Sequence, residues 1–208
     1  MSTYTYEYEA REGSLETYEW DNVWWEHTEI KDARRVMYIG DSISCATRKS
    51  ANTISDGELL FDGFGTSKAL DNRYFKDSLR IFAAQQGKRD IILFNNGLHG
   101  WHLSEDEYAD YYDDFVKFLI GEFNDTPILI LLTTHISDDE RDKRVCVRNE
   151  KAMAVAEKYG IPTVDLYTLT YKNSHFLSAD GVHLVREGYD ILANAVIDEI
   201  RKVLDTEK

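Results

Sequence analysis

The stretch "RVMYIGDSISCATRKS" (residues 35–50) decides how the rest of the sequence is interpreted. A short apolar run, Val36–Ile39, meets Gly40, Asp41 and Ser42 and passes at once into a polar, helix-like segment. A strand-to-helix turn needs only a glycine and a polar residue that caps the helix. The same turn also places a serine hydroxyl at the edge of a sheet, where a nucleophile could stand. Residues elsewhere in the chain must decide between these two interpretations.

Four more short apolar runs follow, with helix-like segments between them. The candidate strands are Val36–Ile39, Leu59–Phe61, Ile91–Phe94, Ile128–Thr133 and Thr163–Leu166. Runs that are apolar throughout are typical of strands covered on both faces. The last helical segment has the clearest period, with apolar residues at steps of three or four: Val185, Tyr189, Leu192, Val196, Ile200 and Val203. This alternation predicts an α/β fold with a parallel sheet between two helical layers.

The composition fits one domain and argues against several classes of partner. The chain has 208 residues, and 43% of them are hydrophobic, which is enough for a single core. The formal net charge of −14 repels nucleic acid and anionic membranes, and no apolar run is long enough to span a bilayer. We expect Cys45 and Cys146 to be free thiols. Residues 1–10 lack the apolar core of a signal peptide, so we expect a cytoplasmic protein.

The first 34 residues differ from the rest because acids alternate with tyrosines and tryptophans. We interpret residues 1–34 as an N-terminal arm that packs on a domain formed by residues 35–208. The alternative is that Trp24 and Trp25 wall a substrate cleft or form the contact of a homodimer.

Polar chemistry gathers in the loops that should leave the carboxyl ends of the strands, where open α/β sheets bind their ligands. Asp180 and His183 stand three residues apart just before the last helix. One turn can direct both side chains to one point, with the Asp carboxylate on one imidazole nitrogen and the other nitrogen free for Ser42. Taken alone, Asp180 would be a turn residue and His183 an ordinary surface or core histidine. The conjunction with a serine at another strand end favours a catalytic set.

These blocks resemble those of the GDSL, or SGNH, hydrolases: Gly40-Asp41-Ser42 early, an asparagine loop in the middle and Asp180-x-x-His183 late. The resemblance extends from about Val36 to the C-terminus. It implies a flavodoxin-like three-layer α/β/α sandwich, with about five parallel strands in the order 2-1-3-4-5. It also implies ester hydrolysis through a serine acyl-enzyme without metal or cofactor.

Two blocks depart from the family pattern. The third block, usually Gly-x-Asn-Asp, is replaced by "FNNG", and we prefer Asn96 over Asn95 as the side-chain donor to the oxyanion. An ordinary left-handed turn is the alternative for this pair. In the second block the glycine spacing fits poorly, so its backbone donor is the N–H of Gly65 or of Ser67. The N–H of Ser42, at a helix N-terminus, is a further donor.

Four residues are candidates for substrate contact: Asp41, Asn95, His99 and Trp101. The ring of Trp101 suits the face of a sugar, and packing under the next helix is the equal alternative. For Asp41 we favour a role in fixing the loop. A metal site at the histidines lacks further ligands, and Arg148 is interpreted as a surface or ion-pair residue.

We therefore predict a serine esterase that removes short acyl groups, with an O-acetylated sugar as the favoured small substrate. An acyltransferase that uses the same acyl-enzyme is the nearest alternative. A carbohydrate-binding module with a decayed site is the alternative from another class.

Overall fold

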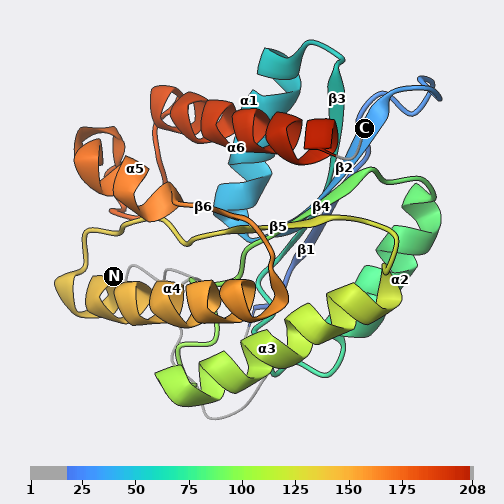
Figure 1. The fold of residues 1–208 in the computed structure, drawn as a ribbon. Coiled ribbons are helices and arrows are strands. Elements are labelled where there is room, and N and C mark those ends of the chain that lie inside the picture. Colours follow the sequence, from blue (N-terminus) through green and yellow to red (C-terminus); the bar gives the residue numbers. More distant parts are fainter. Residues whose placement is uncertain (1–17, 207–208) are drawn as a thin grey trace.

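The computed structural model describes residues 18–206, which form a six-stranded mixed sheet between two layers of helices (Figure 1). The strands are β1 (Asp21–Trp24), β2 (Arg34–Gly40), β3 (Leu59–Thr66), β4 (Ile91–Phe94), β5 (Ile128–Leu131) and β6 (Thr163–Val164). They lie in the order β1-β3-β2-β4-β5-β6, and β1 alone is antiparallel to its neighbour. The predicted order 2-1-3-4-5 is confirmed for the five parallel strands.

The sheet differs from the prediction at the β1 edge. Strand β1 was not predicted because its four residues are all exposed and show no apolar run. It pairs with β3, which continues to Thr66 and not only to Phe61. The glycines in β3 suggested a loop, but they leave space for helix α1 (Ser42–Ser55): a Cβ on Gly63 would lie 2.5 Å from atoms of Arg48. The sheet is therefore mixed, with a short antiparallel edge. Residues 1–17 of the predicted arm lie outside the described residues.

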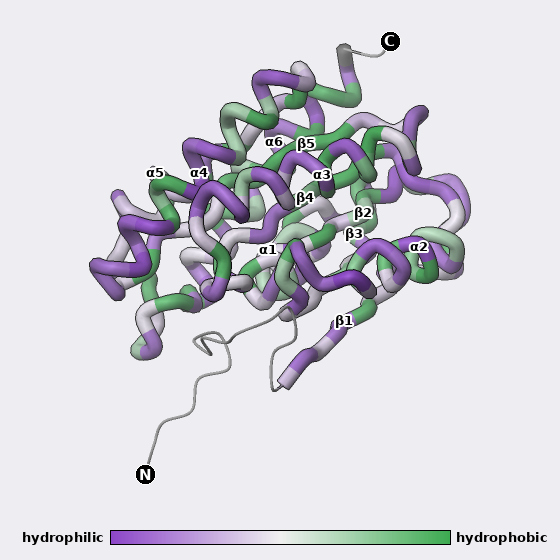
Figure 2. Tube along the Cα trace, turned by 90° about the horizontal axis from the view of Figure 1, so that it is seen from below, coloured by the Kyte–Doolittle hydropathy of each residue, from purple (hydrophilic) through white to green (hydrophobic). Residues whose placement is uncertain are grey.

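Helices cover both faces of the sheet. Besides α1 they are α2 (Phe75–Gln86), α3 (Glu105–Glu122), α4 (Asp139–Tyr159), α5 (Leu166–Lys172) and α6 (Arg186–Thr206), with a short 3-10 turn at Ser174–Phe176. Along β2, Val36 and Tyr38 pack into the core beneath α1 and α6, and Met37 and Ile39 into the core beneath α2 and α3. Figure 2 shows hydrophobic residues along the central strands and a mixture of hydrophobic and hydrophilic residues along the helices. No helix in the described part of the chain is long and apolar enough to cross a membrane.

The chain leaves β2 at Gly40, where the packing of Ser44 leaves no room for a side chain. A Cβ on Gly40 would lie 2.4 Å from the Ser44 Oγ. The next residue, Asp41, caps α1 by accepting the Ile43 N–H at 3.0 Å. Together they make Ser42 the first residue of α1, at the carboxyl edge of the sheet. The loops after β3, β4 and β5 leave the same edge, because all four strands are parallel.

Candidate active site

The segment before α6 is folded around the carboxylate of Asp180. Its Oδ1 accepts the backbone N–H groups of Val182 and His183, each at 2.9 Å, and the Ser178 hydroxyl at 2.8 Å. The turn passes through Gly181 at a φ of +73°, a conformation that favours glycine. These bonds leave Oδ2 to face the ring of His183.

Three of the predicted residues meet at this edge of the sheet. The Oδ2 of Asp180 lies 2.7 Å from the Nδ1 of His183, and the Nε2 of His183 lies 2.8 Å from the Oγ of Ser42. Partial burial works to raise the pKa of Asp180, but the N–H groups of Val182 and His183 and the histidine ring together hold that pKa well below its ordinary value. Asp180 is therefore a carboxylate at neutral pH and fixes the orientation and tautomer of the imidazole.

The two asparagines after β4 have different hydrogen-bond partners. The Nδ2 of Asn95 donates to the carbonyl of Leu131 at 2.7 Å and to the Oγ1 of Thr133 at 3.1 Å. Those two bonds use both hydrogens of the amide. The Nδ2 of Asn96 donates to the carbonyl of Lys68 at 3.0 Å, which leaves its second hydrogen for another acceptor. Of the two amides, only that of Asn96 thus has an N–H available to donate to a further acceptor.

The hydrogen bond of the Asn96 amide crosses the edge of the sheet from which Ser42 follows. Strand β2 lies between β3 and β4, and Asn96 reaches from the end of β4 to Lys68, just after β3. Its side chain therefore lies across the carboxyl end of β2, from which Ser42 follows. The hydroxyl of Tyr108 donates to the Asn96 carbonyl at 2.6 Å and fixes this backbone.

The backbone donors expected from the second block have other partners. Gly65 lies inside β3 between Gly40 of β2 and Asn22 of β1, where backbone groups are used by the two ladders. The N–H of Ser67 donates to the carbonyl of Trp20 at 3.1 Å. The structure thus corrects the assignment of Gly65 and Ser67 to the oxyanion site, because the pairing with β1 was not foreseen. The N–H of Ser42 has no intrahelical acceptor, as expected for the first residue of a helix.

The residues considered for substrate contact are all buried. The exposed fraction is 0% for Asp41, 8% for Asn95, 2% for His99 and 8% for Trp101. Asp41 serves as the helix cap, and burial raises its pKa, an effect that His99 and the Ile43 N–H partly oppose. Burial of Trp101 favours the packing alternative over a wall that stacks on sugars.

Arg148 was interpreted as a surface or ion-pair residue. Its side chain is fully buried, so the surface alternative is wrong, and its Nε lies 3.6 Å from the Oε1 of Glu105, as the ion-pair alternative expects. One terminal nitrogen donates to the carbonyls of Gly97 and His99, at 3.0 and 2.8 Å, and the other to Gly100 at 2.9 Å. Arg148 therefore holds the loop that follows the two asparagines. A sequence signal existed, since Arg148 falls on the apolar stripe of α4 between Val145 and Ala152.

Arg144, one turn earlier on α4, holds the rest of the same loop. It donates to the carbonyls of Trp101 and Leu103, at 3.0 and 2.6 Å, and pairs with Glu105. The ring of Trp101 lies against both arginines, with its centroid 5.2 Å from the Cζ of Arg144 and 4.6 Å from that of Arg148. Two arginines and one tryptophan thus make a rigid support beneath the asparagine loop.

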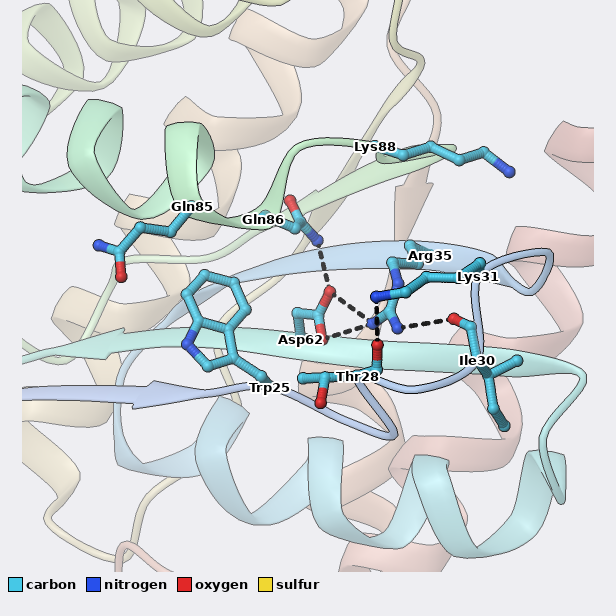
Figure 3. A pocket seen from close by; sticks show the side chains of 9 residues that line it. All are labelled: Trp25, Thr28, Ile30, Lys31, Arg35, Asp62, Gln85, Gln86 and Lys88. Carbon is cyan, nitrogen blue, oxygen red and sulfur yellow. Dashed lines mark hydrogen bonds and ion pairs between the residues drawn. The ribbon is translucent and has the colours of Figure 1, made fainter.

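A cavity of about 560 Å³ lies at the opposite end of the sheet (Figure 3). There Arg35, near the start of β2, pairs with Asp62 at 3.0 Å, beside Trp25 and Lys88. Since Ser42 follows the other end of β2, this cavity is not part of the candidate active site.

Comparison with solved structures places the fold among GDSL/SGNH lipases and acetyl xylan esterases. A lipase/acylhydrolase from Enterococcus faecalis matches with a TM-score of 0.64 and 17% identity, over 81% of this chain and 96% of that one. A member of the lipolytic G-D-S-L family from Veillonella parvula matches with a TM-score of 0.65 and 18% identity, over 80% and 97%. A catalytic serine-to-alanine mutant of an acetylxylan esterase from Geobacillus stearothermophilus matches with a TM-score of 0.62 and 15% identity, over 83% and 96%.

The resemblance inferred from the sequence is thereby confirmed at the level of the fold. No family model and no curated protein matches the sequence. At these low identities the likeness defines an SGNH-like esterase fold, and the chemistry of this chain has to be argued from its own residues.

Proposed function

We propose that this protein is a serine hydrolase that cleaves short-chain acyl esters through an acyl-enzyme. One observation carries the proposal: the unbroken chain of contacts from Asp180 through His183 to the Ser42 hydroxyl, at 2.7 and 2.8 Å. Nucleophile, base and orienting carboxylate are within hydrogen-bond distance, as this chemistry requires.

In the proposed first half-reaction, the Oγ of Ser42 attacks the acyl carbon while His183 Nε2 takes the hydroxyl proton. The carboxylate of Asp180 stabilises the imidazolium that forms. Negative charge develops on the former carbonyl oxygen, where the Ser42 N–H and the second hydrogen of the Asn96 amide can donate to it. Protonated His183 then gives its proton to the leaving alcohol, and the acyl group remains on Ser42.

The second half-reaction reverses these roles with water as the nucleophile. His183 takes a proton from water, which attacks the acyl carbon, and the same donors bind the second oxyanion. Collapse of that intermediate returns the proton to Ser42 and releases the carboxylic acid. Ser42, His183 and Asp180 are then in their starting protonation states.

For the substrate we propose an O-acetyl group on a carbohydrate. The support is that several solved proteins of this fold are acetyl xylan esterases. The buried Trp101 no longer contributes to this argument.

A binding module with a decayed site is the second candidate, and one observation favours it. The N–H of Ser67, expected at the oxyanion, is already bonded to Trp20. Such a module would keep the fold and lack turnover.

A fluorophosphonate probe separates the two candidates. We expect it to label Ser42, to leave Ser42→Ala unlabelled, and to be accompanied by hydrolysis of 4-nitrophenyl acetate. A folded protein that is neither labelled nor active would contradict the hydrolase proposal and support the binding module.

A further inference from the structure

Helix α1 carries a buried arginine that makes neither a hydrogen bond nor an ion pair within the described residues. Arg48 is 7% exposed. Its Nε is buried and meets no hydrogen-bond acceptor within residues 18–206, and no ion pair joins the guanidinium to a carboxylate of that part of the chain. A buried cation without such bonds is costly to keep, unless it awaits a ligand.

Arg35 differs from Arg48 in its hydrogen-bond partners. In the remote cavity of Figure 3, Arg35 donates to both oxygens of Asp62 and to the carbonyls of Glu26, His27 and Ile30. Both terminal nitrogens of that guanidinium are thus bonded by the protein itself. The chain engages Arg35 in this way and makes no such bonds to Arg48.

The surroundings of Arg48 are built to hold it in place. Its side chain lies on Gly63, where any Cβ would clash with it, and its Cζ lies 5.2 Å from the ring centroid of Trp24. Burial lowers the pKa of Arg48, and the carboxylates of Glu26 and Asp62 partly oppose this effect. Both are otherwise engaged, Glu26 with the Trp24 indole and Asp62 with Arg35.

A cavity of about 450 Å³ opens beside this arginine. Its lining comes from α1 and from the segment at β1: Trp24, Glu26, His27, Cys45, Arg48, Lys49, Asn52 and Thr53. Trp24 is half exposed and offers an aromatic surface. Arg48 and Lys49 outnumber the one carboxylate of the lining, in a chain whose formal net charge is −14.

We propose that this cavity, called here the Arg48 cavity, binds an anionic group of the ester substrate, a carboxylate paired with the Arg48 guanidinium. The proposal rests on the proposed esterase function, because the cavity, whose lining reaches along α1 to Cys45, would hold the part of the ester substrate that lies away from Ser42. Planar carboxylates match the donor geometry of arginine, and the exposed indole suits a ring attached to the carboxylate.

The spacing along α1 fits a substrate of modest size. A rise of about 1.5 Å per residue puts Arg48 about 9 Å from Ser42 along the helix axis. Cys45, which lines the cavity, lies one turn from Ser42. A six-membered ring can bridge such a distance between an ester and a carboxylate. The favoured substrates are therefore acetyl esters of acidic ring compounds, such as uronic acids.

The kinetic test compares 4-acetoxybenzoate with 4-acetoxybenzamide, which differ in charge and hardly in shape. We expect kcat/KM to favour the anionic ester by about tenfold or more in the wild type. Arg48→Met should bring that ratio close to one. Lys88→Met, which removes a positive charge in the remote cavity of Figure 3, should leave it unchanged. Equal ratios in the wild type and in Arg48→Met would overturn the proposal and leave the esterase function standing.

A binding test keeps the two proposals separate. In Ser42→Ala, 4-hydroxybenzoate and 4-hydroxybenzamide are titrated while tryptophan fluorescence is recorded. Binding that prefers the carboxylate, and that is lost when Arg48→Met is added, supports the Arg48 cavity even if neither ester is hydrolysed; only the esterase function would then fail. Equal binding of both compounds would overturn the Arg48 cavity.

Thermal melts of Arg48→Met test whether Arg48 serves only the packing of the fold. Replacing an unpaired buried cation by an apolar chain of similar length should leave Tm unchanged or raise it. A large fall in Tm, with the substrate preference intact, would assign Arg48 to packing on Gly63 and contradict the proposal.

Discussion

Ser42 and His183 are separated by 141 positions in the sequence, yet their Oγ and Nε2 atoms lie 2.8 Å apart. One stands on the first turn of α1, after β2, and the other precedes α6. Helices α1 and α6 pack side by side on the same face of the sheet. The contact between the two catalytic candidates is thus a consequence of helix packing, and mutations that separate α1 from α6 should disturb it.

If Ser42, His183 and Asp180 act as a unit, their mutational effects will not multiply. Ser42→Ala and His183→Ala should each lower kcat for 4-nitrophenyl acetate by about 10³ or more, and the double mutant should be little worse. Asp180→Asn should lower kcat less than either. Losses that multiply in the double mutant would show that serine and histidine act independently.

The two asparagines should separate catalysis from stability. Asn96→Ala is expected to lower kcat by about 10²–10³ with little change in KM, because an oxyanion donor acts mainly in the transition state. Asn95→Ala removes the donor to Leu131 and Thr133, so it should lower the free energy of unfolding by about 1–3 kcal/mol.

Thermal melts must accompany the kinetics of both asparagine variants, since a disordered loop imitates a lost donor. If Asn95→Ala loses kcat at an unchanged Tm while Asn96→Ala keeps it, the assignment is displaced by one residue. The fold would be unaffected by that outcome.

The parallel strands could be predicted because each contains an apolar run, which is buried throughout in β3, β4 and β5. Strand β1 could not, since all four of its residues are exposed and its place depends on pairing with β3. The catalytic candidates could be predicted from local sequence patterns: the serine follows a strand at a turn, and the aspartate and histidine stand three residues apart. The backbone donors have no such signal: Ser67 is bonded to Trp20, 47 positions away, and only the register of β1 creates that contact.

Asp180 should stabilise the folded protein at neutral pH and lose this contribution in acid. Its folded pKa lies well below the unfolded value of about 3.9, so its contribution is present above that pH and is lost as the pH falls towards the folded pKa. The difference in Tm between the wild type and Asp180→Asn should therefore be largest near neutral pH and shrink below about pH 4. A difference that stays constant down to the acid transition would show that the carboxylate is not stabilised by its partners.

The contribution of Asp41 to stability should change with pH in the opposite direction. Burial raises its folded pKa, so its contribution is greatest at low pH and is lost as the pH rises through that folded value. Asparagine caps helices as well as aspartate does. Asp41→Asn should then gain Tm relative to the wild type as the pH rises from about 4 to 7. Melts at several pH values test this, and a Tm of Asp41→Asn that falls relative to the wild-type Tm as the pH rises would contradict it.

Among the residues that support the asparagine loop, Arg148 should be the one whose substitution lowers the free energy of unfolding most. Its removal takes a donor away from three carbonyls, those of Gly97, His99 and Gly100, in a fully buried place. We expect Arg148→Met to lower the free energy of unfolding by about 3–5 kcal/mol, measured by urea unfolding. Arg144→Met is the matched control: its side chain is 35% exposed, so the ion pair that it loses is partly screened by solvent and the loss should be smaller.

The same pair of variants tests whether this support also positions the donor amide. Below its melting temperature, Arg148→Met should lower kcat more than it raises KM, because a displaced Asn96 would fail mainly in the transition state. Combining Arg148→Met with Asn96→Ala should add little to the kinetic loss of Asn96→Ala alone. Kinetic losses that are fully additive would show that the arginine stabilises the fold without serving the asparagine.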